Sequence, residues 1–149
     1  MKPDISDMTI IIDTREQTPF SFSYPISRKT LIAGDYSILG FEDKIAIERK
    51  ALGDLTSCVG KDRNRFIKQM EVLSFFHRKY LVIEANLNYI LQGDFGYTKI
   101  NPESVLGTIC KIAIEYNIFP IFAGGHRSGA KITERLLIQY YKKYRGGKI

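Results

Sequence analysis

Two acidic residues and a lysine fall in adjacent segments where they could hold a metal ion. Residues 34–39 and 44–50 both alternate polar and apolar side chains, and residues 40–43 between them are typical of a hairpin loop. If the loop has four residues, Leu39 pairs with Lys44 and Asp35 lies directly opposite Glu48. Opposed carboxylates have Cβ atoms roughly 5 Å apart and repel unless a positive charge lies between them. The spacing therefore predicts a cation site.

The ligand types indicate which cation this site would take. Oxygen ligands without a nearby histidine or cysteine favour magnesium or manganese over zinc. Lys50 follows Glu48 on the same face, roughly 7 Å along the strand, where it could orient or activate a metal-bound water for attack on phosphorus. Asp13 ends the apolar run Thr9-Ile10-Ile11-Ile12 and is a candidate third carboxylate ligand.

Alternation divides the hairpin into two faces. The apolar face holds Tyr36, Ile38, Ile45 and Ile47, and the second face holds Asp35, Ser37, Ala46, Glu48 and Lys50. In the alternative interpretation, the second face is an ordinary solvated surface that mixes acids and lysines. The register decides between the faces, because a slip of one residue reverses them.

The elements that must position these residues alternate between helix and strand. The periodicity predicts a short helix near 51–57 and further helices over 62–76, 102–116 and 129–144, with His77 packed on an apolar helix face. It predicts strands over 80–83 and 118–122. This order indicates an α/β sandwich whose sheet is mixed, because it contains a hairpin. With 149 residues and 44% apolar residues, we expect one domain over 1–149.

The overall composition indicates which classes of partner and which cellular location to expect. The formal charge of +6 suits a polyanion such as nucleic acid. Cys58 and Cys110 have neither zinc-ligand nor disulfide-framework spacing. The sequence shows no secretory signal and no apolar stretch of membrane-spanning length, so we expect a soluble, intracellular protein without a membrane partner.

Several short motifs resemble a known nuclease family. In order along the chain they are Ile12-Asp13-Thr14-Arg15-Glu16, Gly34-Asp35-Tyr36, Glu48-Arg49-Lys50 with Asp54, Arg65-Phe66 and Leu81-Val82-Ile83-Glu84. Together they resemble the XPF-type structure-specific nuclease domain of the restriction-endonuclease-like superfamily. The resemblance implies a restriction-endonuclease-like three-layer sandwich with a central mixed β-sheet flanked by helices. It also implies hydrolysis of DNA at branched structures such as flaps, forks and splayed arms.

The same resemblance implies a role for each motif residue. Asp13, Glu16, Asp35 and Glu48 become acidic site residues, of which Asp13, Asp35 and Glu48 are the predicted metal ligands. Lys50 becomes the catalytic lysine, and Arg49 and Asp54 complete the signature. Alternation places Arg49 on the apolar face, so either the strand bends there or Arg49 pairs with a carboxylate such as Asp54.

Basic residues near these motifs are candidates for DNA contact. Lys61, Arg63, Arg65 and Lys68 cluster at the start of the 62–76 helix, and Arg15 lies within the first motif. A solvated basic face is the alternative. The glycine-rich segment 124–131 is not a Walker motif, because Ala130 precedes Lys131, and it is interpreted as a flexible turn before the last helix.

Three functions stay open at this level. The first is a Mg²⁺- or Mn²⁺-dependent endonuclease for branched DNA, the second a nuclease-like module that binds DNA without cutting, and the third a four-way junction resolvase. Many family members continue into tandem helix-hairpin-helix modules that this sequence lacks, so we expect a stand-alone nuclease domain or one that needs a partner for DNA binding. The family commonly pairs its nuclease domains, and we expect a homodimer that uses the last two helices.

Overall fold

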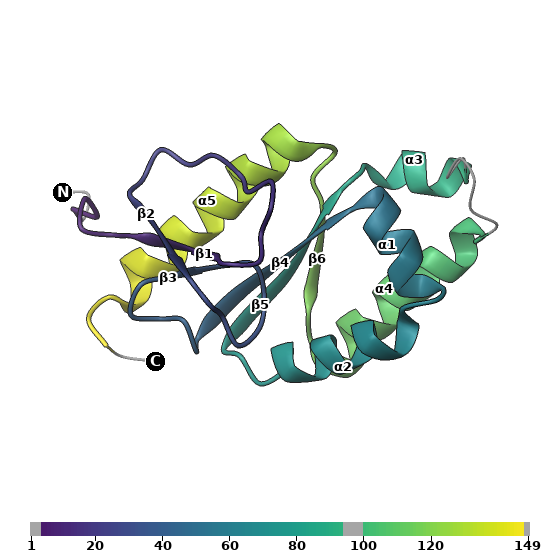
Figure 1. The fold of residues 1–149 in the computed structure, drawn as a ribbon, viewed down its shortest axis with the longest axis horizontal. Helices are drawn as coiled ribbons and strands as arrows, with labels where there is room; N and C mark the ends of the chain where they lie inside the picture. Colours follow the sequence, from purple (N-terminus) through teal and green to yellow (C-terminus); the bar gives the residue numbers. More distant parts are fainter. Residues whose placement is uncertain (1–3, 94–99, 148–149) are drawn as a thin grey trace.

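A single mixed sheet of six strands forms the centre of the protein (Figure 1). The computed structural model describes residues 4–93 and 100–147. The strand order is β2-β1-β3-β4-β5-β6. β3 is antiparallel to both β1 and β4, whereas β1 with β2 and β4 through β6 are parallel. The strands are β1 Ile10–Asp13, β2 Ile26–Lys29, β3 Tyr36–Ile38, β4 Ile45–Ala51, β5 Arg78–Glu84 and β6 Phe119–Phe122.

Helices cover both faces of this sheet and complete three layers. Because parallel neighbours need crossover connections, the chain forms helices between β4 and β5 and between β5 and β6. α1, α2 and α4 lie on one side of the sheet and α5 on the other (Figure 1). The predicted α/β sandwich with a mixed sheet is confirmed. The helices are α1 Leu52–Val59, α2 Arg63–Leu73, α3 Leu87–Gln92, α4 Pro102–Tyr116 and α5 His126–Tyr144.

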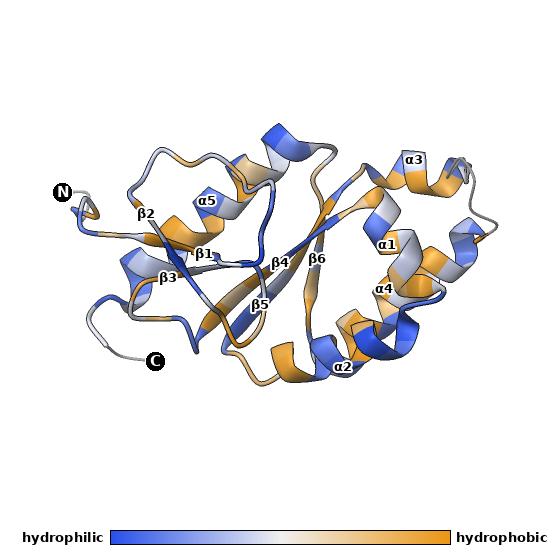
Figure 2. Ribbon diagram, viewed as in Figure 1, coloured by the Kyte–Doolittle hydropathy of each residue, from blue (hydrophilic) through white to orange (hydrophobic). Residues whose placement is uncertain are grey.

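Two apolar cores hold the layers together, one on each face of the sheet. Alternate residues of one strand enter different cores: Leu81 and Ile83 of β5 pack with α1, α2 and α4, while Val82 packs with α5. β4 behaves in the same way at its start, but it turns from apolar to polar along its length (Figure 2). Its polar end, Glu48 to Lys50, pairs with Leu81 to Ile83 of β5, which are completely buried.

The predicted hairpin register is confirmed. Tyr36 pairs with Ile47, which is the register that a four-residue loop requires, and Gly40 in the loop has a φ of 92° that favours glycine. The alternative of a solvated second face is wrong, because Ser37 and Ala46 are completely buried. Helices α1, α2 and α4 cover that face, which a single hairpin could not indicate.

Some boundaries differ from the sequence-based prediction. α2 ends at Leu73, so His77 is not on a helix; it follows a short turn and its ring packs against Tyr140 and Tyr144 of α5. α5 begins at His126, three residues before the predicted start, so the glycine-rich turn is shorter than expected. Two short elements were missed. β2 is an exposed edge strand of four residues without alternation, and α3 has only six residues.

Within the described residues, no helix combines the length and the apolar character needed to cross a membrane.

Candidate active site

Three carboxylates line up across three adjacent strands at one end of the sheet. The pairing of Ile12 with Tyr36 continues to Asp13 and Asp35, where the Asp13 N–H donates to the Asp35 carbonyl at 2.8 Å. On the other side, Asp35 donates its N–H to the carbonyl of Ile47 at 2.8 Å, next to the Tyr36–Ile47 pair, and the Asp35 carboxylate lies close to that of Glu48. Directly opposed residues point to the same face of a sheet. We call Asp13, Asp35 and Glu48 the acidic row.

The acidic row lies in a cavity of about 760 Å³. Lys50 and Asp54 line the cavity together with the row, and Arg15 and Arg65 stand among the cationic lining residues. Five predicted site residues therefore meet in one place, although they are up to 52 positions apart in the sequence: Asp13, Asp35, Glu48, Lys50 and Arg65.

Asp35 and Glu48 form a strained pair of acids. Burial and then the negative charge of Glu48 raise the pKa of Asp35 well above its ordinary value. The backbone N–H of Arg49 donates to Asp35 Oδ2 at 2.8 Å and opposes this rise only in part. Buried carboxylates that share a space hold a proton or bind a cation. Their oxygen-only chemistry fits a hard divalent cation.

Lys50 supplies the nearest positive charge on this face. Its Nζ lies 3.5 Å from Glu48 Oε1 and 5.9 Å from the centre of the Phe66 ring of α2. Burial acts to lower the pKa of Lys50, but the nearby carboxylate of Glu48 contributes most to outweighing it, and the pKa rises above its ordinary value. Lys50 is therefore a charged hydrogen-bond donor at neutral pH.

Asp13 differs from the other two acids because its oxygens already have partners. Arg15 Nε donates to Asp13 Oδ2 at 2.8 Å and Arg15 Nη2 to Oδ1 at 3.1 Å, and the backbone N–H of Leu31 donates to Oδ1 at 2.9 Å. Burial opposes the shift, but these bonds lower the pKa of Asp13. Among residues 4–93 and 100–147, no three acidic, histidine or cysteine side chains converge as a ready-made metal site. Metal binding by all three acids stays a prediction.

Arg49 lies on the opposite face of β4, as alternation indicates, without a bend in the strand. Its guanidinium donates to Glu84 Oε1 of β5, to Glu16 Oε2 at 3.1 Å and to His126 Nδ1 at 3.0 Å. It also stacks 4.6 Å from the centre of the Phe20 ring. The expectation of a carboxylate partner is confirmed, but the partners are Glu16 and Glu84 rather than Asp54.

Glu16 belongs to this second cluster and also lines the acidic cavity, where its charge helps to raise the pKa of Asp35. Besides Arg49, the hydroxyl of Tyr36 donates to Glu16 Oε2 at 2.8 Å. We call Glu16, Arg49, Glu84 and His126 the Arg49 cluster. The sequence showed Glu84 only as the last residue of a family motif, without a role, and assigned His126 no role. Both residues reach Arg49 through strand order and the docking of α5.

The basic residues predicted to contact DNA are not equivalent. Arg65 is 75% exposed in its side chain, lines the acidic cavity, and has only a 3.7 Å contact with Asp62. Arg63 instead donates to Thr108 of α4 at 2.8 Å and so ties two helices together. Lys61 and Lys68 are exposed on α2 or just before it, outside the lining of the cavity.

Comparison with known proteins agrees with this fold. Two similar solved structures are of XPF from Aeropyrum pernix, one of them in complex with DNA. Their TM-scores are 0.70 and 0.69, each at 18% sequence identity, with 93% and 91% of this chain covered. The chain spans 67% and 66% of their lengths. No curated protein sequence matches. The ERCC4 domain matches residues 12–136, which include the acidic row and the Arg49 cluster. The chain therefore belongs to the ERCC4 domain family, as its motifs predicted.

Proposed function

We propose that the chain is a divalent-metal-dependent endonuclease that cuts branched DNA such as flaps, forks and splayed arms. The observation that carries this proposal is the acidic row with Lys50 on the same face, in a cavity that also holds Arg15 and Arg65. Membership in the ERCC4 domain family and the likeness to an XPF structure in complex with DNA support DNA as the substrate. The same substrate implies an intracellular location.

The acidic row would hold Mg²⁺ or Mn²⁺. Asp35 and Glu48 fit this role best, because both oxygen donors face one cavity and the protein compensates their charges only in part. Asp13 would join them when its ion pair with Arg15 opens. A divalent cation bound there supplies polarisation of the phosphodiester and a bound water of lowered pKa.

Lys50 acts as a donor in this mechanism. Since its pKa is raised in the metal-free protein, Lys50 is a charged hydrogen-bond donor there at neutral pH. Its ammonium is held between Glu48 and the Phe66 ring, which limits the directions it can take. Lys50 therefore orients the attacking water or binds a phosphate oxygen and stabilises the charge that develops there.

The Arg49 cluster supports the acidic row from behind. Arg49 contacts two carboxylates and His126 with its side chain, while its backbone N–H donates to Asp35. A shift of the side chain would move the backbone group that orients Asp35. Glu16 and Arg49 are therefore proposed as positioning residues for the catalytic site.

Contacts with the DNA backbone would come first from Arg15 and Arg65, at the cavity. Lys61 and Lys68, exposed nearby, would extend the contact along the duplex. Arg63 takes part only if it leaves Thr108.

A cleavage assay tests the proposal and its alternatives. The protein is incubated with labelled flap, fork, four-way junction and plain duplex in magnesium, manganese or chelator. We expect cutting of flap and fork that needs metal and is lost in Asp35→Ala. Asp43→Asn is a matched control, because Asp43 is an exposed acid in the loop of the same hairpin. Binding without cutting would favour the DNA-binding module, and preferred cutting of the four-way junction would favour the resolvase.

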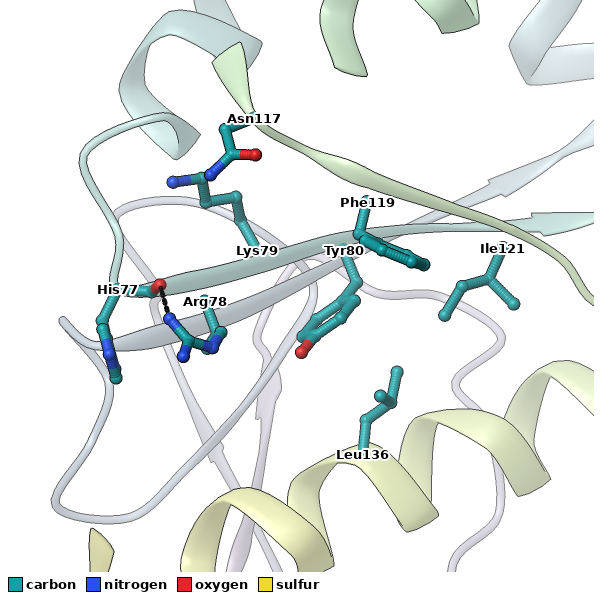
Figure 3. A pocket seen from close by; sticks show the side chains of 8 residues that line it. All are labelled: His77, Arg78, Lys79, Tyr80, Asn117, Phe119, Ile121 and Leu136. Atoms are coloured by element: carbon teal, nitrogen blue, oxygen red, sulfur yellow. Dashed lines mark hydrogen bonds between the residues drawn. The ribbon is translucent and has the colours of Figure 1, made fainter. Parts of the chain in front are cut away.

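We also propose that the chain forms a homodimer through the β6 edge and helices α4 and α5. β6 ends the sheet, and its Phe119 is 64% exposed. Ile114 of α4 is 85% exposed. Between β5, β6 and α5 runs a groove where Tyr80, Phe119 and Leu136 converge (Figure 3). Exposed apolar side chains beside a free strand edge favour association.

The mass in solution tests the dimer. We expect light scattering to give about twice the 17.1 kDa of one chain at micromolar concentration, and Phe119→Glu to give a monomer. Phe75→Glu is the control, since Phe75 is 89% exposed at the end of α2. An unmodified protein that is monomeric at this concentration would contradict the proposal.

A further inference from the structure

The guanidinium of Arg15 is bonded to Asp13, one of the three acids of the acidic row. A metal bound by all three acids would have to compete with it. The guanidinium contacts both oxygens of Asp13, at 2.8 and 3.1 Å, and Nη2 also donates to the Leu31 carbonyl at 2.8 Å. The side chain of Asp13 is only 3% exposed, whereas that of Arg15 is 68% exposed. The carboxylate is therefore fixed, and its partner is free to leave toward solvent.

The negative charges of all three acids in the acidic row act on Arg15. The pKa of Arg15 is raised first by its bond to Asp13 and the charge of Asp13, and further by the charges of Asp35 and Glu48. A divalent cation attracted by the same three acids would meet the positive charge of Arg15. It would also find both oxygens of Asp13 already accepting hydrogen bonds. Arg15 and the metal therefore compete for one carboxylate.

We propose that Arg15 is an exchangeable counterion of the acidic row. It neutralises Asp13 while no metal is bound, gives way to a divalent cation, and then binds a phosphate of the DNA. This inference rests on the proposed function. Solvent screens the exposed Arg15 end of this ion pair and weakens it, so a doubly charged ion can displace the guanidinium. The released guanidinium stays at the cavity, where its fork of donors suits a phosphate group.

Arg65 provides a matched comparison within the same cavity. It is 75% exposed, like Arg15, and lines the cavity. Its only ion pair within the described residues is the 3.7 Å contact with Asp62, which is outside the acidic row. Loss of Arg65 should therefore affect DNA binding but not metal binding, whereas loss of Arg15 should affect both, in opposite directions.

Metal affinity without DNA is the first measurement. Binding of Mn²⁺ is followed by calorimetry for the unmodified protein, Arg15→Met, Arg65→Met and Asp13→Asn. We expect Arg15→Met to bind Mn²⁺ about two- to fivefold more tightly, which is the effect of losing a weak ion pair. Arg65→Met should match the unmodified protein, and Asp13→Asn should bind at least about tenfold more weakly. If Arg15→Met does not fold, Arg15→Lys, which keeps the charge but loses the fork, should give a smaller gain.

DNA affinity is the second measurement, by fluorescence anisotropy in Ca²⁺ at several salt concentrations. Arg15→Met and Arg65→Met should each reduce the slope of log K against log salt by about 1, the value for one lost phosphate contact. Mn²⁺ affinity that falls or stays unchanged in Arg15→Met would overturn the exchange, as would normal Mn²⁺ binding by Asp13→Asn. The expected Mn²⁺ pattern in a protein that cuts no DNA would support the exchange and overturn only the proposed cleavage.

Discussion

The two faces of β4 both carry charged residues, but the charges are compensated to different degrees. On one face, Asp35 and Glu48 lie side by side with only Lys50 to compensate them, and the pKa of Asp35 rises. On the other face, Arg49 is surrounded by Glu16 and Glu84, and its pKa also rises, although burial opposes this. In Arg49 the rise means that its charge is stabilised, and in Asp35 that its charge is destabilised.

This difference indicates that one face stabilises the fold and the other forms the candidate site. The Arg49 cluster is satisfied by groups of the protein itself and stabilises the fold around β1, β4, β5 and α5. The acidic row is compensated less completely, and under the proposed function a cation from outside would supply the missing charge. A site that binds a metal must stay unsatisfied without it, and it needs a rigid support close by. The two faces can be separated by mutation.

The largest expected effect is on stability, from Arg49→Met. It leaves the carboxylates of Glu16 and Glu84, which are only 17% and 10% exposed in their side chains, without their cation, and we expect the free energy of unfolding to fall by about 3–5 kcal/mol. Urea denaturation followed by circular dichroism measures this. Lys50→Met is the control on the other face. An equal loss of stability in Lys50→Met would contradict the difference between the two faces.

The next effect is on cleavage, from Asp35→Asn. This variant removes a carboxylate from the strained pair, so we expect cleavage to fall by more than about 100-fold, because supporting groups of metal sites alone are worth 10- to 100-fold. Thermal stability in chelator should stay the same or increase, since the repulsion from Glu48 is gone. A marked fall in melting temperature would show that Asp35 serves the fold and not the metal.

A pH effect of intermediate size should distinguish the metal-free and metal-bound proteins. The pKa of Asp35 is raised on folding, so the folded state binds more protons than the unfolded state. In chelator, stability should therefore fall as the pH rises above about 4, by up to about 1.4 kcal/mol per pH unit. Melting temperatures in chelator from pH 5 to pH 8 check this, and Asp35→Asn should flatten the curve.

Excess Mg²⁺ should oppose this trend. The metal binds the deprotonated acids, so its stabilising effect should grow as the pH rises. The same melting series with Mg²⁺ measures this difference. A stabilisation by Mg²⁺ that does not depend on pH would argue against binding at Asp35.

The smallest expected effect is from His126→Ala. His126 is 45% exposed in its side chain and accepts one hydrogen bond from Arg49, so its loss should lower the free energy of unfolding by about 0.5–1.5 kcal/mol. Urea denaturation of His126→Ala and of Arg127→Ala, a neighbour on the same helix turn, measures this difference. A loss as large as that of Arg49→Met would mean that α5, and not the pair of glutamates, holds the cluster.

Local patterns were sufficient for much of the site. The loop length set the register that brings Asp35 opposite Glu48, and alternation separated Arg49 from Glu48 and Lys50. Both results depend on neighbours within one hairpin, where geometry is set by turn length and the two-residue period. The motifs also indicated the correct family and the mixed sheet.

The position of Asp13 beside Asp35 was beyond these patterns, because it depends on β1 joining the sheet next to β3. Short elements such as β2 and α3 also escaped prediction, since four to six residues carry too little periodicity. The partners of Arg49 escaped for another reason. Glu84 and His126 reach it from a neighbouring strand and from α5, and no local signal records which elements will be adjacent.

The sequence by itself indicated the candidate chemistry of this protein: which acids, which lysine, and the spacing that brings two of the acids together across a hairpin. Only the tertiary structure decided how each charge is compensated. Asp13 lies in the acidic row yet is bonded to Arg15, and Arg49 lies among carboxylates 33 and 35 positions away. The physical reason is that the state of a charge depends on its burial and its neighbours in space, and these arise only when the layers pack.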